Sequence, residues 1–208
     1  MRYRGLGRIY HGAFALFLVL ALTVQLALVL RAGSGVPHGT RVIRFFSYFT
    51  VESNILVAAG ASLVAVDPAR DSLWWRVLRL DGLVGIAVTG VIYSSVLAGL
   101  HSLTGWDKAT DVALHYISPV AAVAGWLAFG PRPRINVRTI GLALIWPVAW
   151  LGYTLAHGAA TSWYPYPFVN VGEHGYSRVL ANCLVVTIVL GVVAGAAWLV
   201  DRHTPATD

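Results

Sequence analysis

The stretch FFSYFTVESNILV, residues 45–57, decides how this chain folds. It opens a long apolar segment, yet it carries two hydroxyls, a carboxylate and an amide between Thr50 and Asn54. Inside a bilayer, each polar group without a partner costs several kcal/mol. Helical spacing places one set of polar side chains on a single face: Ser47, Thr50, Ser53 and Asn54. Glu52 points roughly 200° away from Thr50, so we expect both faces to be covered and the helix to lie centrally in a bundle.

Composition places the chain among membrane proteins. Of its 208 residues, 57% are hydrophobic and 12% are charged, and the mean hydropathy is +0.68, which is atypical of soluble domains. The basic residues flank apolar runs and do not interleave with aromatic residues, so we expect membrane lipid and no nucleic acid as a partner. Cys183 is the single cysteine, so no disulfide framework exists.

Six apolar segments approach the roughly 20 residues that span a bilayer. They cover residues 9–30, 43–66, 81–101, 111–130, 138–158 and 178–200. The first follows three arginines, as a signal peptide would, but it is too long for a signal core and no small-x-small cleavage site follows it cleanly, so we predict a retained helix. The sequence therefore predicts an all-α fold, a single six-helix transmembrane domain over residues 1–208.

The distribution of basic residues predicts the orientation in the membrane. With the N-terminus inside, ten of the fifteen Lys and Arg residues fall on the inner side and five on the outer side. The positive-inside rule then places both termini in the cytoplasm. We expect a multi-pass protein of the cell inner (plasma) membrane.

Polar residues from four of the expected helices share the outer third of the membrane. Thr50 lies about 10 Å below the outer surface and His115 about 6 Å below it, at 1.5 Å per residue. The third helix ends outside at His101, and the fifth ends outside at Tyr153 and His157. This convergence predicts a site in the outer half of the membrane.

The residue types permit nucleophilic catalysis. The hydroxyl of Thr50 needs a base to take its proton, and His115 is the best candidate because imidazole titrates near neutral pH. Asp111, one turn earlier, either orients the imidazole or caps the N-terminus of its helix. Asn54 either donates to an oxyanion or joins helices. Glu52 is a functional candidate because it is a carboxylate within the membrane.

The outer loop TSWYPYPF, residues 161–168, has two possible roles. Its two prolines hold it extended. Its aromatic residues suit either a belt at the level of the lipid headgroups or a cover over the site. No H-E-x-x-H motif occurs, so we expect no metal and no other cofactor.

These residues resemble the androgen-induced membrane protein family and its bacterial relatives. The resemblance runs from the second to the sixth expected helix, and its motifs are short. It rests on FTVESN at 49–54, on His115 followed by Pro119, and on WYP at 163–165 with PF at 167–168.

The resemblance implies a function. The animal members of the family hydrolyse fatty acid esters of hydroxy fatty acids with an intramembrane threonine and a histidine. By position, Thr50 is then the nucleophile and His115 the general base. This chain has Val112 where the animal proteins carry a further histidine, and its histidine-to-proline spacing is one residue shorter. We therefore predict the broader class, a lipid ester hydrolase.

The remaining site residues are expected to contact the lipid ester substrate: Glu52, Ser53, Asn54, Tyr153, His157, Trp163 and Tyr164. Two alternatives stay open. A binding or transport protein would use Glu52 and histidines as a substrate or proton site. A b-type haem protein would pair two histidines among His101, His115 and His157.

Overall fold

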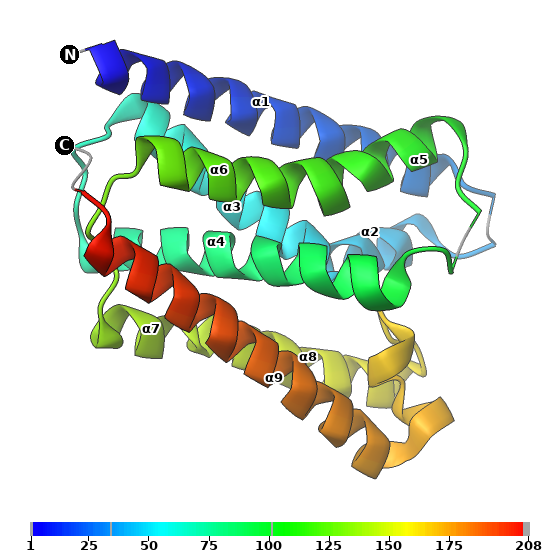
Figure 1. The fold of residues 1–208 in the computed structure, drawn as a ribbon. Helices are drawn as coiled ribbons and strands as arrows, with labels where there is room; N and C mark the ends of the chain where they lie inside the picture. The colour runs from blue at the N-terminus through cyan, green and yellow to red at the C-terminus, as the bar shows by residue number, and fades with distance from the viewer. Residues whose placement is uncertain (1, 34, 101, 206–208) are drawn as a thin grey trace.

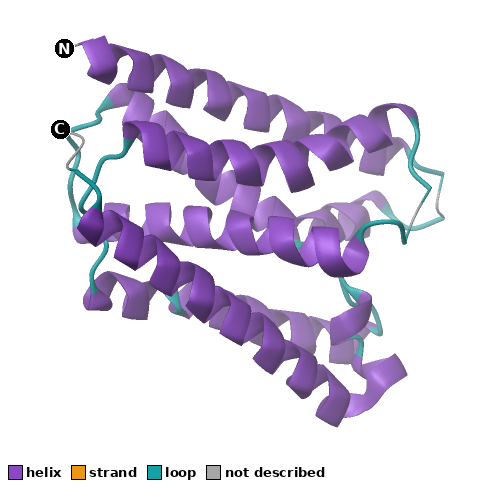
Figure 2. Ribbon diagram, in the orientation of Figure 1, coloured by secondary structure: helices purple, strands orange, loops and turns teal. Residues whose placement is uncertain are grey.

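The computed structural model describes residues 2–33, 35–100 and 102–205, which form a bundle of helices with no strand in the described part. Loops lie only at the two ends of the bundle and between broken helices (Figures 1 and 2). Six helical units are long and apolar enough to cross a membrane. The prediction of an all-α, six-helix membrane bundle is confirmed.

The helices run in the following order along the chain: α1 (Arg2–Arg31), α2 (His38–Phe46), α3 (Phe49–Val66), α4 (Leu73–Ile92), the π turn η1 (Tyr93–Leu97), α5 (Gly105–Val112), the π turn η2 (Ala113–Ile117), α6 (Ser118–Phe129), α7 (Val137–Ala143), α8 (Ile145–Thr161), the 3-10 turn η3 (Pro167–Val169) and α9 (Val171–His203).

All six expected helices are observed, but with other bounds or with a break. The first and the sixth begin seven residues earlier than expected, at Arg2 and Val171. The second is broken between α2 and α3, where Tyr48 is extended with ψ 126°. The third begins at Leu73, eight residues before the expected start, after Ser72 accepts a hydrogen bond from the Trp75 N–H at 3.3 Å. The fourth begins at Gly105 instead of near residue 111. Polar and charged side chains in these first turns hide the helix starts from a search for apolar runs.

Two prolines explain two further irregularities. A proline clashes with the carbonyl four residues earlier and cannot donate to it. The π turn η2 lies directly before Pro119 and contains His115, whose carbonyl is the one that this proline cannot bond. The break between α7 and α8 falls at Leu144, three residues before Pro147.

The bundle has two layers that meet at α4. In one layer, α1 packs on α3 and on α6, and both α3 and α6 pack on α4. In the other, α7 packs on α8 and α8 on α9, while α7 and α9 also contact α4 (Figure 1). The expectation that the helix of residues 43–66 is central is therefore only partly correct, because α4 touches both layers and α3 lies between α1 and α4.

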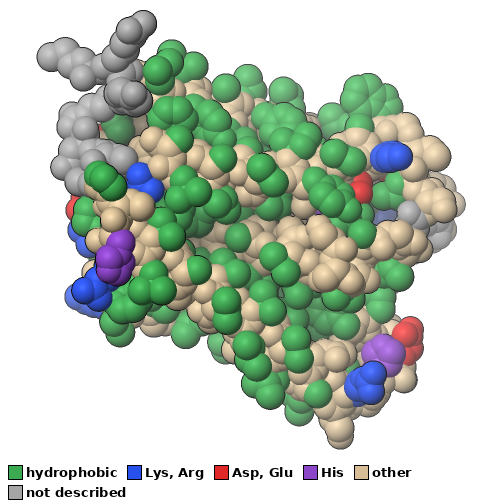
Figure 3. All heavy atoms as spheres, viewed as in Figure 1, with side chains coloured by type: hydrophobic (Ala, Val, Ile, Leu, Met, Phe, Trp, Pro, Cys, Tyr) green, Lys and Arg blue, Asp and Glu red, His purple; other side chains and the backbone are tan. Residues whose placement is uncertain are grey.

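Charge separates the ends of the bundle from its middle. On the face drawn in Figure 3, charged side chains gather at the two ends and hydrophobic ones cover the surface between them. We call the end where α1 begins and α9 ends the terminal end, and the opposite one the far end (Figure 1). The assignment of the terminal end to the cytoplasm stays a prediction.

Candidate functional site

A large, mainly apolar cavity lies between the two layers in the far half of the bundle. It contains about 850 Å³ of space not filled by atoms, part of it open to the surroundings. Its walls come from α3, α4, η1, α8, η3 and α9. Apolar side chains supply most of the wall, among them Val88, Ile92, Leu151, Val186 and Leu190.

Thr50 meets this cavity from the first turn of α3. Its backbone N–H has no partner within the helix, as is general for first-turn amides, and it donates to the hydroxyl of Tyr166 at 3.2 Å. The Thr50 hydroxyl lies 3.3 Å from the same oxygen. Burial raises the pKa of Tyr166 to about 12. The phenol therefore stays neutral at physiological pH and keeps a proton to donate.

The loop after α8 brings Tyr166 to Thr50. Pro165 and Tyr166 are both buried, and the Tyr166 ring stacks on Phe168 with centroids 5.4 Å apart. Asn182 on α9 anchors the loop by donating to the Phe168 carbonyl at 2.8 Å. Because Tyr166 and Phe168 line the cavity, this arrangement favours the role of a cover over that of an aromatic belt alone.

His115 lies in the π turn η2 with one ring nitrogen fully engaged. Its Nδ1 is 3.0 Å from the Asp111 carbonyl and 2.9 Å from the Asp111 carboxylate. Both neighbours are acceptors, so Nδ1 carries a hydrogen and the neutral ring presents Nε2 as its acceptor. Tyr93 donates to the other Asp111 oxygen at 2.7 Å and stacks on the imidazole with centroids 3.8 Å apart.

This geometry decides between the two roles considered for Asp111. Thr104 is the N-cap residue of α5 and Asp111 lies near the end of that helix, so the capping role is wrong. Asp111 orients His115, as the other alternative has it. The π turn brings the next helix close to α4, where a Cβ on Gly90 would lie 2.9 Å from Pro119, so only glycine fits there without a shift.

No hydrogen bond joins the side chains of Thr50 and His115, and Asn54 links the two segments that carry them. The Asn54 side chain donates to the Thr50 carbonyl at 2.8 Å and to the Leu114 carbonyl at 3.3 Å. It thereby ties the backbone of the candidate nucleophile to the residue that precedes the candidate base. The Tyr93 ring, which stacks on His115, lines the same cavity as Thr50.

Glu52 faces the α8 side of α3 and is held by a tryptophan. The Trp146 indole N–H donates to its carboxylate at 2.7 Å, and the indole stacks on Phe49 with centroids 4.5 Å apart. A Cβ on Gly85 of α4 would lie 2.8 Å from the Trp146 ring. The absence of a side chain at Gly85 therefore lets Trp146 approach α4 and reach Glu52.

An aromatic cluster surrounds the break between α2 and α3. The Tyr153 hydroxyl is 2.6 Å from that of Ser47, and its ring stacks on His157 with centroids 5.5 Å apart. Trp163 meets the His157 ring edge-on and lies under the Arg44 guanidinium, 5.0 Å from it. None of these five residues lines the large cavity.

Among the predicted nucleophile, base and substrate-contacting residues, only Thr50 lines the large cavity. Ser53 and Asn54 are 0% exposed, and both Asn54 hydrogen bonds go to carbonyls. The Asn54 side chain thereby joins two helices, whereas the Ser53 hydroxyl is buried without a hydrogen-bond partner in the described chain. Contact of these two residues with substrate stays a prediction. Tyr164 packs its ring over Gly158, with 2.0 Å between a ring carbon and a Cβ placed there. His101 lies outside the described residues.

The sequence reasoning missed Tyr166, Tyr93 and Trp146. Tyr166 lies between the two prolines of the loop, and such a constrained aromatic residue was a usable signal. Tyr93 and Trp146 resemble ordinary interfacial or core aromatic residues. Nothing in their local sequence identifies the carboxylates that they bond.

Neither a protein-family model nor a curated protein nor a solved structure matches this chain. Across residues 2–33, 35–100 and 102–205, no group of three or more His, Cys, Asp or Glu side chains is placed to hold a metal ion.

Proposed function

We propose that this protein is a threonine-dependent lipid ester hydrolase of the cell inner (plasma) membrane, with Thr50 as nucleophile and His115 as general base. One observation carries the proposal: a threonine hydroxyl, backed by a neutral tyrosine, lies in the wall of a mainly apolar cavity inside the membrane bundle. Acyl chains suit such a wall because the removal of apolar surface from water is favourable. Fatty acid esters of hydroxy fatty acids are the substrates that the sequence resemblance implies.

The proposed reaction has two balanced steps. Thr50 attacks the ester carbonyl as His115 Nε2 takes the hydroxyl proton, and that proton then leaves with the alcohol as the ester bond breaks. Water, deprotonated by the same nitrogen, hydrolyses the acyl-threonine and frees the carboxylic acid and Thr50. In the free protein Thr50 bonds Tyr166, so substrate entry must bring hydroxyl and imidazole together, or a water must relay the proton.

Tyr166 fits the task of oxyanion stabilisation that the sequence suggested for Asn54. Its hydroxyl lies beside the Thr50 hydroxyl, and its raised pKa keeps it a donor. A donor fixed beside the reacting carbonyl stabilises the negative charge that develops on the oxygen. The Asn54 amide cannot do so while it bonds two carbonyls.

The decisive experiment measures hydrolysis of a fluorogenic lipid ester by purified protein in nanodiscs. Thr50→Ala should abolish turnover with little change in thermal stability, because it removes a hydroxyl and a methyl group without adding bulk. Thr50→Ser should keep part of the activity. Thr50→Ala combined with His115→Ala should be hardly worse than either single variant, since residues that act as a unit are not additive.

Thr187→Ala is the matched control for that experiment. Thr187 lines the same cavity, but its hydroxyl donates to the Cys183 carbonyl on its own helix at 2.8 Å. It should retain most of the turnover. Wild-type turnover in Thr50→Ala, or equal losses in Thr50→Ala and Thr187→Ala, would contradict the threonine mechanism.

One observation favours binding or transport as a second candidate function. Trp146 bonds Glu52 and also lines a smaller cavity that contains Asp81 of α4. One indole thus bonds one carboxylate of the membrane-crossing helices and lines the same small cavity as a second, and such groups mark proton or ion pathways in many membrane proteins. Proton uptake by liposomes that is lost in Glu52→Gln, together with no ester cleavage by wild-type protein, would favour this function.

A further inference from the structure

A second cavity lies at the terminal end, far from Thr50 along α3. It contains about 730 Å³ of space not filled by atoms, including its open part. Residues of α1, α3, α4, α6 and α9 and of the segment between α6 and α7 form its walls. Three arginines and one aspartate are among them: Arg76, Arg79, Arg134 and Asp201.

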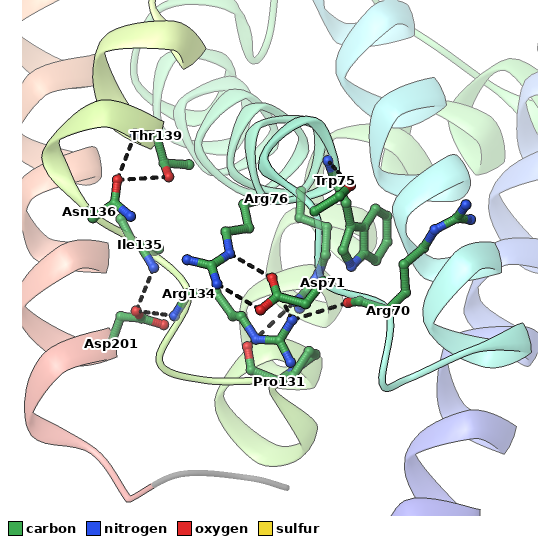
Figure 4. Close-up of polar contacts among 12 residues, drawn as sticks. Arg70, Asp71, Trp75, Arg76, Pro131, Arg134, Ile135, Asn136, Thr139 and Asp201 are labelled. Atoms are coloured by element: carbon green, nitrogen blue, oxygen red, sulfur yellow. Dashed lines mark hydrogen bonds and ion pairs between the residues drawn. The ribbon is translucent and has the colours of Figure 1, made fainter.

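Asp71 and Asp201 both accept hydrogen bonds from other residues at this end. Asp71 holds Arg76 through two hydrogen bonds of 2.6 Å and Arg134 at 2.8 Å (Figure 4). Asp201 accepts the backbone N–H groups of Arg134 and Ile135 at 2.6 and 2.7 Å. These bonds join the loop after α3, the segment before α7 and the end of α9.

Arg79 lacks such a partner. Its guanidinium donates to the carbonyls of Gly130 and Pro131 at 2.8 and 3.4 Å, and in the described part of the chain it takes part in no ion pair. Three arginines with two aspartates leave one positive charge in excess. Arg79 lies about 9 Å inside α4 from the start of the helix at 1.5 Å per residue. Asp201 is near enough to interact with its charge but forms no ion pair with it, and an excess positive charge in such a place is unfavourable.

Two buried polar atoms of the cavity wall also lack partners in the described chain. They are Oδ1 of Asp201 and Nε2 of His11, which belong to side chains that are 0% and 7% exposed. Buried polar groups are satisfied in most proteins, so each exception calls for a ligand or a water. The Asp201 oxygen accepts hydrogen bonds, and a simple anion such as a fully ionised carboxylate offers it none.

We propose that the terminal-end cavity binds a phosphate group that carries a hydroxyl, with Arg79 as the anion contact and Asp201 as the acceptor of the hydroxyl. A planar guanidinium bonds phosphate oxygens well. The remaining wall is apolar, with Leu56, Val57 and Leu83, and this suits the carbon skeleton of a lipid. Two sources share this chemistry: the headgroup of a glycerophospholipid with a polyol, such as phosphatidylglycerol, and free hydrogen phosphate.

The test is a titration of purified protein in mild detergent, read by thermal unfolding. Phosphatidylglycerol should raise Tm saturably, and phosphatidylcholine at the same concentration should not, because its headgroup has no hydroxyl and its phosphate is paired with a cation. Inorganic phosphate alone, at matched ionic strength, distinguishes the sources. A rise with phosphate assigns the free anion, and a rise only with phosphatidylglycerol assigns the lipid.

Two variants connect the effect with this cavity. Arg79→Gln should weaken the affinity about tenfold or more, the loss expected for one charge-assisted hydrogen bond. Its control is Arg70→Gln, which removes the same charge at the same end, where the Arg70 side chain is exposed and points away from Asp71 (Figure 4). If Arg79→Gln does not fold, Gly60→Val replaces it, because a Cβ there meets Leu78 and Arg79 at the ordinary distances of 3.7 and 3.8 Å and its methyl groups narrow the cavity.

The outcomes are distinct. A saturable rise in Tm that is lost in Arg79→Gln or Gly60→Val and kept in Arg70→Gln supports the proposal. No rise with either ligand in wild-type protein overturns it, and so does an equal loss in Arg70→Gln. None of these results depends on ester hydrolysis, since Arg79 and Gly60 do not contact the Thr50 cavity.

Discussion

At the terminal end of the bundle, arginines, aspartates and backbone groups from several segments bond one another. Asp71 holds two arginines, and Asp201 holds two backbone N–H groups. At the far end, the polar groups form short chains: Tyr93 bonds Asp111, Asp111 bonds His115, and Tyr166 bonds Thr50. The first arrangement connects chain segments, and the second orients one imidazole and one hydroxyl.

This contrast assigns stability and reactivity to different ends of the fold. A network that joins loops must break before the terminal end can open, so its loss should reduce stability. The far-end chains act largely between neighbouring side chains beside an apolar space, so a conservative change there should leave the fold and remove the chemistry. Three predictions examine this division, beginning with the largest effect.

Asp111→Asn should have the largest effect, a loss of about 100-fold or more in ester turnover. An amide can donate to His115 and so favour the wrong tautomer, as when the aspartate of a catalytic triad is replaced. The fold should remain, because the side chain keeps its size. Turnover and Tm of the purified variant are to be measured together.

Asp107→Asn is the control for this variant. Asp107 lies on the same helix, α5, and is exposed, so its change should alter neither quantity. A turnover in Asp111→Asn within about twofold of wild type, too small a change for a triad-like role, would remove Asp111 from the mechanism and weaken the contrast between the two ends.

Asp201→Ala should have an intermediate effect, on stability. It leaves the N–H groups of Arg134 and Ile135 without their acceptor in a buried place, and each unsatisfied buried donor costs about 1–3 kcal/mol. We expect a loss of roughly 2–4 kcal/mol in the free energy of unfolding, measured by denaturant titration in detergent. Asp201→Asn, which keeps one acceptor oxygen, should lose less. Equal stability of wild type and Asp201→Ala would show that the terminal-end network joins nothing.

Asp71→Asn should have the smallest effect, and one that depends on pH. The hydrogen bond from Arg76 lowers the pKa of Asp71 to about 2, but the side chain is 34% exposed, so we expect less than about 1 kcal/mol. Because the pKa is lower in the folded state, the stabilisation is fully present above the ordinary value of 3.8 and is lost as pH falls through about 2. Unfolding measured from pH 6 to pH 2 should show the two proteins converging at the acid end. A difference that grows toward acid pH would contradict the assignment.

The crossing helices were predictable from sequence because their length and apolar composition directly meet the demands of a bilayer. The exact starts of α4 and α5 were not, since Trp75, Arg76 and Asp107 place polar groups in helical turns that an apolar search discards. The proline irregularities were partly predictable. Pro119 and Pro147 predict interruptions of their helices. Only the structure shows that a π turn precedes Pro119 and that the break before Pro147 falls at Leu144.

The candidate site was predictable only where function and local chemistry coincide in one residue. Thr50 and His115 stand out as polar groups in apolar helices. The partners that define them come from elsewhere: Tyr166 from a loop 116 residues away along the chain, and Tyr93 from the π turn η1. The depth argument placed Tyr153 and His157 correctly at the far end, but depth does not tell which side of a helix a residue faces, and they lie in the aromatic cluster beside Ser47.

The π turn at Ala113–Ile117 has a consequence for how this chain can change in length. Such a turn contains one residue more than an α-helical turn, as a single-residue insertion would produce. Removing that residue would let α5 and α6 run as one regular helix, but it would rotate everything before the deletion by about 100° relative to α6. Pro119 would still rest on Gly90, while the carboxylate of Asp111 would face a different neighbour. The extra residue thus sets which side of the bundle the Asp111 carboxylate faces. With it, Asp111 orients His115; without it, the helix would still pack against α4 but would lose that contact.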